Sequence, residues 1–434
     1  MKRMRNRYLE KQAFCPPQLT RPPNPDTGII VVIPCHDEPD FLQTLDSLFE
    51  CQRPQCAVEI LVVVNESART PDKIKLQNQR TYEDIQEWIQ THANPDFQVH
   101  AIHVKAMPKK HAGVGLARKI GMDEAVARFE SIGQKKGIIV QLDADCTCAS
   151  NYLVSIETQY QKTPETTGGT LYFEHPLDDL SGEHRLAMAQ YELYLRYYVN
   201  ALRYADFPYA FHTIGSCITV RSDIYQKVGG MNKRKAGEDF YFLQKVIQTW
   251  HCAKIKATCV YPSPRFSDRV PFGTGKAVEE RIEAPEQKSQ AYHPLIFRDL
   301  KPLMASVPTL FSMGDLALGD FRQTLPEAVS GFLKEQDFVD RILELQANTT
   351  SVQAFVKGFF RWFNAFVAMK YVHYARDHHY PSQPIEQVAR WLLEQVYQDQ
   401  VTLLSGEKDI CEAERLLMAF RTLDKQTQPV PLPQ

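Results

Sequence analysis

The sequence contains no run of about 18 uninterrupted apolar residues, the length that a membrane-spanning helix requires. The basic residues 1–7 are not followed by an apolar segment before Pro16, so no secretory signal is expected. The segment 355–372 comes nearest to a spanning helix, but Lys357 and Arg361 interrupt it, and it is predicted to form one amphipathic helix. We therefore expect a cytoplasmic protein, for which peripheral membrane contact stays open.

The sequence also lacks an excess of either charge, since 50 Lys and Arg residues stand against 52 Asp and Glu residues. A nucleic-acid-binding protein normally carries a basic excess, so we expect no nucleic-acid partner. The ten cysteines are scattered along the chain, and Cys146 and Cys148 have no second pair at the spacing of a zinc site. Reduced thiols are expected rather than a scaffold built on disulfides.

A chain of 434 residues is too long for one ordinary hydrophobic core, and three regions can be distinguished. Residues 1–27 form a basic, proline-rich arm. In residues 28–284 apolar strands alternate with helices, whereas residues 285–434 are almost wholly helical in composition. Strands that are apolar throughout are typical of parallel βαβ units buried on both faces. The sequence thus predicts an α/β fold with strands at residues 28–33, 58–64, 97–104 and 137–142.

The last of these predicted strands, residues 137–142, ends abruptly in Asp143 and Asp145. Ionised side chains at the end of a buried strand cost several kcal/mol unless a partner compensates. A divalent cation that bridges to a phosphate would compensate, and open α/β sheets bind ligands at the carboxyl ends of their strands. Many strands also end in an Asp that caps the next turn, so the pair needs support from other parts of the chain.

Polar loops follow the first two predicted strands as well. The first strand leads into Pro34, Asp37 and Glu38, and the second ends at Asn65. Taken alone, the first loop is explained equally well as a turn that caps a helix beginning near Phe41.

Further along, a glycine-rich turn at Gly113 leads into a helix that carries Arg118. By itself such a turn indicates only a flexible connection. Glu238 and Asp239 stand at the start of another predicted helix, where carboxylates also act as caps because of the helix dipole.

A loop at residues 264–275 contains Arg265 and Arg269. Guanidinium groups match the geometry of phosphate oxygens, although arginines in surface loops are usually just solvated. The order of all these features along the chain is harder to attribute to chance than any one of them.

In this order the motifs resemble those of the family 2 glycosyltransferases, which have the GT-A fold. The resemblance covers roughly residues 28–275, the usual size of one such domain. It implies a Rossmann-like, mostly parallel sheet flanked by helices, followed here by a helical C-terminal region. It also implies an enzyme that transfers a sugar from a UDP- or GDP-linked donor to a hydroxyl of a glycan or small-molecule acceptor.

The resemblance also implies roles for the donor-binding residues. The family usually has Asp at the position of Asn65. Asp143 and Asp145 would bind Mg²⁺ or Mn²⁺, which bridges the diphosphate of the donor. Arg265 and Arg269 would close over that diphosphate. The residues that would border the nucleotide are Pro34, Asp37, Glu38, Asn65, Gly113, Arg118 and Asp143.

For the acceptor, the resemblance implies an inverting reaction in which Asp239 removes the proton of the attacking hydroxyl. Glu238 would be its neighbour and bind the acceptor. The helical region 285–434 has no motif that can be assigned, and a homodimer formed through it is compatible with the sequence.

Two other functions stay open. A sugar-nucleotide-forming nucleotidyltransferase usually carries a Gly-x-Gly-x-Arg loop after its first strand, where this chain has residues 34–38. A nucleotide-binding regulatory module without catalysis is supported only by Asn65 and is disfavoured by the carboxylate pairs. Pyrophosphate release would indicate the first, and binding without turnover the second.

Overall fold

The computed structural model describes residues 6–234, 237–249, 251–266, 273–398 and 411–426. The chain divides into two compact units, of which the first comprises Met1–Pro176 and Thr213–Phe272 and the second Leu177–His212 and Gly273–Gln434. This division differs from the boundary expected at residue 284, because residues 177–212 group with the C-terminal helices. As functional domains, the regions 1–27, 28–284 and 285–434 stay a prediction.

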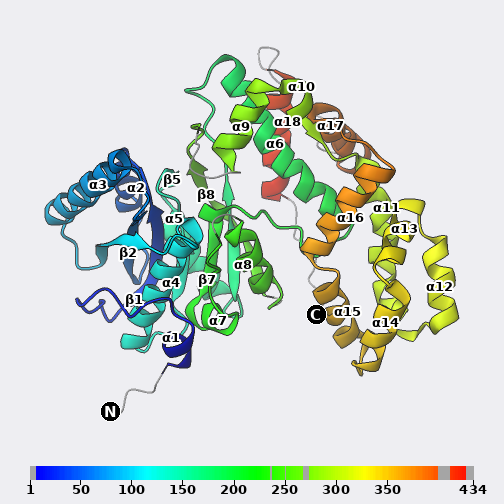
Figure 1. Cartoon of the computed structure of the whole chain (residues 1–434), viewed down its shortest axis with the longest axis horizontal. Coiled ribbons are helices and arrows are strands. Elements are labelled where there is room, and N and C mark those ends of the chain that lie inside the picture. The colour runs from blue at the N-terminus through cyan, green and yellow to red at the C-terminus, as the bar shows by residue number, and fades with distance from the viewer. Residues whose placement is uncertain (1–5, 235–236, 250, 267–272, 399–410, 427–434) are drawn as a thin grey trace. The chain divides into compact units, whose positions relative to one another are not determined.

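The first unit is built on a sheet whose strand order, within the described residues, is β3-β2-β1-β4-β7-β6-β8-β5 (Figure 1). The parallel half consists of β3 (Phe97–Met107), β2 (Ala57–Ser67), β1 (Thr27–Cys35) and β4 (Ile138–Gln141). The other half is mixed and consists of β7 (Ile218–Arg221), β6 (Gly168–Phe173), β8 (Cys252–Pro262) and β5 (Cys146–Cys148). The predicted α/β fold with a mostly parallel sheet is confirmed.

The central strands are buried on both faces, as their continuous apolar sequences predict. Val31 of β1 is fully buried and lies in register between Ile60 of β2 and Val140 of β4. β-branched side chains pack well on such a pleated, buried surface. Because β1, β2 and β4 are parallel, their carboxyl ends meet at the same edge of the sheet, where α/β folds bind ligands.

Helices flank this sheet, and one of them, α4, is buried on almost every side. Its buried residues include five charged ones, Arg118, Lys119, Asp123, Glu124 and Arg128. Buried charges need ion-pair or hydrogen-bond partners, so the segments that pack around α4 must supply such partners. The helices of the first unit are α1 (Arg7–Lys11), α2 (Leu42–Phe49), α3 (Asp72–Thr91), α4 (Val114–Ser131), α5 (Tyr152–Lys162), the 3₁₀ turn η1 (Gly215–Cys217), α7 (Ser222–Lys227) and α8 (Glu238–Ile247).

The N-terminal arm supplies several of these partners. Tyr8 Oη donates a hydrogen bond to Asp123 (2.7 Å), and the backbone N–H of Phe14 donates to the same carboxylate (2.9 Å). The backbone N–H of Gln18 donates to Glu124 (2.6 Å). The described part of the arm is therefore an integral part of the first unit, which its basic, proline-rich composition does not indicate.

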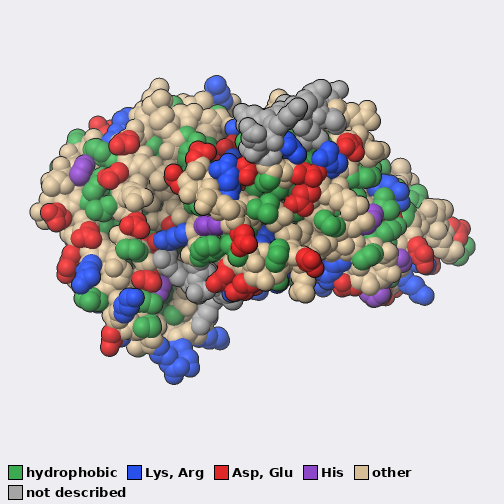
Figure 2. Space-filling model, turned by 90° about the horizontal axis from the view of Figure 1, so that it is seen from above, with side chains coloured by type: hydrophobic (Ala, Val, Ile, Leu, Met, Phe, Trp, Pro, Cys, Tyr) green, Lys and Arg blue, Asp and Glu red, His purple; other side chains and the backbone are tan. Residues whose placement is uncertain are grey.

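The second unit is helical, as expected for the C-terminal region. None of the helices in the described residues combines the length and the apolarity needed to cross a membrane. Figure 2 shows acidic and basic side chains interspersed over one face of the molecule, as the balanced composition suggests. The elements of this unit are α6 (Gly182–Tyr204), α9 (Thr274–Glu283), α10 (Pro285–Lys288), β9 (Gln290–Ala291), α11 (Pro294–Ser306), η2 (Val307–Ser312), α12 (Asp315–Thr324), α13 (Glu327–Glu335), α14 (Phe338–Ala347), α15 (Val352–Trp362), α16 (Ala365–His378), β10 (Gln383–Pro384), α17 (Ile385–Val396) and α18 (Glu412–Gln426).

The prediction of one amphipathic helix over residues 355–372 is wrong, because this segment spans the end of α15 and the start of α16. Asn364 lies between them, and its side-chain oxygen accepts from the backbone N–H groups of Phe366 (2.9 Å) and Val367 (3.2 Å). This Asn cap starts a new helix.

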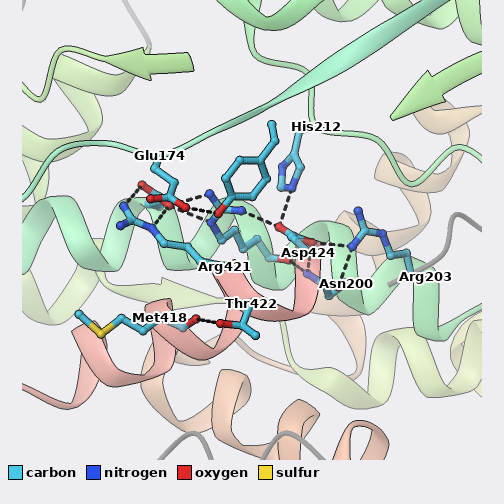
Figure 3. Close-up of polar contacts among 11 residues, drawn as sticks. Glu174, Asn200, Arg203, His212, Met418, Arg421, Thr422 and Asp424 are labelled. Carbon is cyan, nitrogen blue, oxygen red and sulfur yellow. Dashed lines mark hydrogen bonds and ion pairs between the residues drawn. The ribbon is translucent and has the colours of Figure 1, made fainter. Parts of the chain in front are cut away.

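A buried ionic cluster joins α6 to α18 (Figure 3). Asp424 of α18 accepts from Nη1 of Arg196 (2.7 Å) and from Nη1 of Arg203 (2.6 Å), and Nε2 of His212 lies 3.2 Å from it. Burial alone would raise the pKa of Asp424, but the His212 hydrogen bond and the charges of Arg203 and Arg196 lower that pKa well below its usual range. The cluster explains why α6 groups with the C-terminal helices.

Replacing Asp424 with Asn should lower the free energy of unfolding by about 3–5 kcal/mol, because Arg203 would lose its buried counter-charge and Arg196 would lose one of its buried carboxylate partners. Urea denaturation at neutral pH measures the change. In the unchanged protein, the contribution of Asp424 should be present above its unfolded pKa of about 3.9 and be lost as the pH falls through the lower folded-state pKa.

The matched control is Asp377→Asn, which removes an exposed pair with Arg376 in the same unit. Exposed ion pairs contribute little, so this variant should keep the midpoint of the unchanged protein. Equal midpoints for the two variants would contradict a stabilising role for the buried cluster.

Candidate functional site

The loop after β1 is held in place by α3. The backbone N–H of Asp37 donates to Oδ1 of Asn78 (2.8 Å), and Asp37 has a φ of 56°, in the left-handed region that Asp adopts more readily than most residues. Thr81 Oγ1 donates to the backbone carbonyl of Glu38 (2.9 Å). Pro34 is buried within β1 and has no polar group to offer a ligand other than its carbonyl.

Asn78 also holds the end of β2. Its Nδ2 donates to the backbone carbonyl of Asn65 (3.2 Å) and to Glu66 (3.3 Å), and Nδ1 of His36 lies 2.6 Å from the same carbonyl. One fully buried amide thus connects the loop that contains Asp37 to the end of β2 at Asn65. Asn78 could not be predicted from the sequence, because an isolated Asn in a polar helix belongs to no motif.

Asp143 and Asp145 follow β4 at the same edge of the sheet. Thr44 Oγ1 of α2 donates to the backbone carbonyl of Ala144 between them (3.0 Å), which fixes the turn. Their side chains are 33% and 29% exposed, so both carboxylates are accessible to a ligand despite their proximity to the core.

Arg118 of α4 connects Asp143 to the start of α8. One guanidinium nitrogen, Nη2, pairs with Oδ1 of Asp143, and the other, Nη1, pairs with Oε1 of Glu238. Burial acts to lower the pKa of Arg118, but the charges of Asp143 and Glu238 outweigh it and raise that pKa. Arg118 was expected to lie beside a nucleotide, and its contacts with two carboxylates are an additional finding.

Glycine makes room for this guanidinium. A Cβ added to Gly215 in η1 would lie 2.5 Å from Nη2 and 2.8 Å from Cζ of Arg118. A Cβ on Gly115, at the start of α4, would overlap the backbone carbonyl of Arg234 and contact Glu238. The predicted Gly113 is the N-cap of α4, so the glycine-rich turn positions the helix that carries Arg118.

Glu238 and Asp239 begin α8, directly after Gly237, whose φ of 69° favours glycine. Glu238 is 1% exposed and is committed to Arg118, whereas Asp239 is partly exposed. Among the described residues, the hydrogen bond that reaches the carboxylate of Asp239 comes from the backbone N–H of Phe240 (2.7 Å). Burial raises the pKa of Asp239 to about 6, although the nearby charge of Arg118 opposes the increase.

Arg265, after β8, pairs with two carboxylates at the edge of the sheet. Its Nη2 lies 2.6 Å from both oxygens of Glu38 and 2.9 Å from Oδ2 of Asp145. Burial acts to lower the pKa of Arg265, and Asp145 and Glu38 together raise it. The structure therefore brings Glu38, Asp145 and Arg265 together, while Arg269 lies outside the described residues.

The donor chemistry of Asp143 and Asp145 suits a hard divalent cation. Among the described residues there is no cluster of three or more His, Cys, Asp or Glu side chains that could hold a metal ion by themselves. Mg²⁺, however, is often held by one or two carboxylates, with phosphate and water completing its coordination. Within the same residues, no hydrogen bond to Oδ2 of Asp143 is present, so this oxygen fits such a role.

Part of this chain matches the model of a known family. Residues 30–229 match the model of glycosyl transferase family 2. A search of curated proteins found no match.

Several solved structures are similar to this chain. Residues 1–349 of TarS from S. aureus in complex with UDP-GlcNAc are 11% identical with a TM-score of 0.39, and the match covers 77% of this chain and 91% of that chain. The same TarS fragment with UDP has 12% identity, a TM-score of 0.36 and the same coverage. A longer S. aureus TarS chain is 14% identical with a TM-score of 0.35, covering 69% of this chain and 50% of that one.

Replacing Gly215 with Ala should displace the guanidinium of Arg118 and lower the free energy of unfolding by about 1–3 kcal/mol, the usual cost of overpacking. Urea denaturation measures this cost. The matched control is Gly319→Ala in α12, where an added Cβ meets nothing within 4 Å.

A double-mutant cycle tests whether the cost of Gly215→Ala arises at Arg118. In the background Arg118→Met, which lacks the guanidinium, adding Gly215→Ala should cost much less than it does alone. Additive costs would show that Gly215 acts through another neighbour.

Proposed function

We propose that this protein transfers a sugar from a nucleotide-diphosphate donor to an acceptor hydroxyl, with a divalent cation and with inversion at the anomeric carbon. The premise is that residues 30–229 belong to glycosyl transferase family 2. The observation that carries the proposal is the pairing of Arg118 with both Asp143 and Glu238. The guanidinium of Arg118 holds Asp143, on the side proposed for the leaving group, close to Glu238, on the side proposed for the acceptor. A displacement needs the leaving group and the acceptor to be bound in one place.

The leaving group would be bound at Asp143 and Asp145. These two carboxylates would hold Mg²⁺ or Mn²⁺, which supplies a Lewis acid for the charge of the departing nucleoside diphosphate. The guanidinium of Arg265 lies beside Asp145 and Glu38 and would add a second positive charge for the phosphate oxygens.

The nucleoside would lie against the loop after β1 and the end of β2. Asp37, Glu38 and Asn65 are the residues that we propose for contacts with base and ribose. Their backbones are held by Asn78 and Thr81, so this edge of the site is organised before a donor binds. Preorganisation lowers the entropic cost of binding.

Asp239 is the proposed base. Its carboxylate would accept the proton of the acceptor hydroxyl while the hydroxyl oxygen forms a bond to the anomeric carbon. The bond between that carbon and the phosphate oxygen breaks on the opposite side, and its electron pair leaves with the nucleoside diphosphate. A pKa of about 6 suits this role, because the carboxylate is ionised at neutral pH and yet is more basic than an ordinary Asp.

A screen of UDP- and GDP-linked sugars separates this proposal from its alternatives. Release of UDP or GDP on donor hydrolysis or transfer supports a glycosyltransferase. Pyrophosphate release from a nucleoside triphosphate would instead indicate a nucleotidyltransferase. Binding without turnover of any donor would indicate a regulatory module.

Replacing Asp145 with Asn should remove most of the dependence of nucleotide binding on Mn²⁺, because a neutral amide is a much weaker ligand for a hard cation than a carboxylate. Isothermal titration calorimetry with UDP and GDP, with and without Mn²⁺, measures the effect. We expect Mn²⁺ to strengthen binding to the unchanged protein at least about tenfold, or about 1.4 kcal/mol, and to have little effect on the variant.

Asp84→Asn is the control for Asp145→Asn, since it makes the same chemical change on the exposed face of α3. This control should keep the full response to Mn²⁺. A response of Asp145→Asn equal to that of the control would rule out Asp145 as a metal ligand.

Replacing Asp239 with Asn should reduce kcat by about 10²–10⁴-fold and leave donor affinity within twofold, because the amide cannot accept the proton. In the unchanged protein, activity should be constant above about pH 6 and fall about tenfold per unit below it, since only the ionised carboxylate acts as a base. Steady-state kinetics at saturating donor and Mn²⁺ measure both effects. A fully active variant, or an acid limb near pH 4, would contradict the assignment.

A further inference from the structure

Two thiols that the proposed reaction does not use lie in contact near the turn that contains Asp143 and Asp145. Sγ of Cys51, just after α2, is 3.5 Å from Sγ of Cys148, at the end of β5. They are 97 residues apart in the sequence, so the fold brings them together. All ten cysteines of the chain are in the described part of the structure, and none forms a disulfide there.

The surroundings of the two sulfur atoms differ. Cys51 is 4% exposed, and its thiol donates to the backbone carbonyl of Ser47 (3.3 Å) and lies 3.7 Å from that of Ala149. Cys148 is half-buried on β5, which is the last strand in the order of the sheet. Two thiols in contact, of which one ionises more readily than the other, are the usual arrangement of a redox-active pair.

The pKa values of the two thiols are shifted in opposite directions. The pKa of Cys51 is lowered by the hydrogen bond from Cys148, by the N–H groups of Leu153 and Tyr152 and by the charge of Arg53, against the effect of burial. The pKa of Cys148 is raised by its hydrogen bond to Cys51 and by burial. These directions favour Cys51 over Cys148 as the thiolate of the pair.

We propose that Cys51 and Cys148 form a reversible intramolecular disulfide, with a small peroxide as the oxidant and Cys51 as the thiol that reacts first. The inference rests on the contact between the two sulfur atoms, and it does not depend on the proposed function. Peroxide is small enough to reach a sulfur atom that is nearly buried, whereas a bulky disulfide is not.

Oxidation of the two thiols by peroxide takes place in two steps. The Cys51 thiolate attacks one oxygen of hydrogen peroxide, the O–O bond breaks, and hydroxide leaves, so that Cys51 becomes a sulfenic acid. The sulfur of Cys148 then attacks Sγ of Cys51, the S–O bond breaks, and hydroxide leaves and takes up the proton of Cys148 as water. Two thiols and one peroxide give one disulfide and two waters, and a dithiol reductant reverses the oxidation.

The disulfide would fasten α2 to the segment that carries the metal-binding carboxylates. The S–S distance would shorten from 3.5 Å to about 2.05 Å. α2 already holds this segment, because Oγ of Ser47 accepts from the backbone N–H of Cys148 (2.9 Å) and Thr44 donates to the carbonyl of Ala144 (3.0 Å). The new bond therefore joins elements that are already in contact, so little rearrangement is needed.

The test uses the full chain with Cys411→Ser, which removes the exposed thiol and so prevents disulfides between molecules. The protein is treated with increasing hydrogen peroxide, remaining thiols are blocked with iodoacetamide, and peptides are mapped by mass spectrometry. We expect the loss of two alkylatable thiols per chain, a disulfide peptide that joins Cys51 to Cys148, and full recovery on addition of dithiothreitol. A peptide map of this Cys411→Ser protein without the joined peptide would overturn the proposal, and this outcome does not require that any further variant folds.

Three further variants identify the order of reaction. In Cys148→Ser, Cys51 should accumulate as a sulfenic acid that dimedone traps. In Cys51→Ser, Cys148 should stay alkylatable at peroxide concentrations at least about tenfold higher, because its thiol stays protonated. Cys56→Ser is the matched control, since burial raises the pKa of that thiol to about 12 and it should leave the disulfide intact. Equal oxidation of Cys148 with and without Cys51 would refute the assignment of Cys51 as the first thiol to react.

Discussion

A guanidinium that is only 3% exposed has to be paired, and the pairing of Arg118 determines how the candidate site is assembled. An unpaired ion at this depth would cost several kcal/mol. Asp143 after β4 and Glu238 at the start of α8 supply the two compensating charges, although they are 95 residues apart in the sequence by their numbers. Arg118 reaches both only because α4 is almost fully buried and because glycine at position 215 leaves space for the guanidinium.

The buried position of α4 has further consequences for the first unit. Arg128, near its end, needs a partner and pairs with Glu59 of β2, where Nη2 lies 2.8 Å from Oε1. Asp123 and Glu124 take hydrogen bonds from the N-terminal arm. The arm therefore helps to hold α4, whose first turns carry Arg118. The same hydrogen bonds fix the position of this proline-rich segment, which lies outside the sheet. Stability of the unit and geometry of the site depend on the same helix.

The sequence predicts the parallel strands well, because each is a continuous apolar run, and the strands in turn place the loops of Asp37, Asn65 and Asp143 at one edge. The partners of Arg118 could not be predicted, since an ion pair between distant segments leaves no local pattern. The same holds for Asn78, whose hydrogen bonds to backbone groups need no motif. The grouping of α6 with α18 depends likewise on a buried ionic cluster that only the three-dimensional arrangement reveals.

Adjacent carboxylates at the start of α8 have different environments, and this difference is the strongest physical reason to assign them different roles. Glu238 is buried and paired with Arg118, so its carboxylate is held in place and has little freedom to move toward an acceptor. Asp239 is held by the N–H of Phe240 and has its pKa raised by burial to about 6. A carboxylate whose pKa is raised toward the working pH is the better proton acceptor. Asp239 is therefore the carboxylate that we propose as the base, a choice that the order of the two residues in the sequence does not by itself explain.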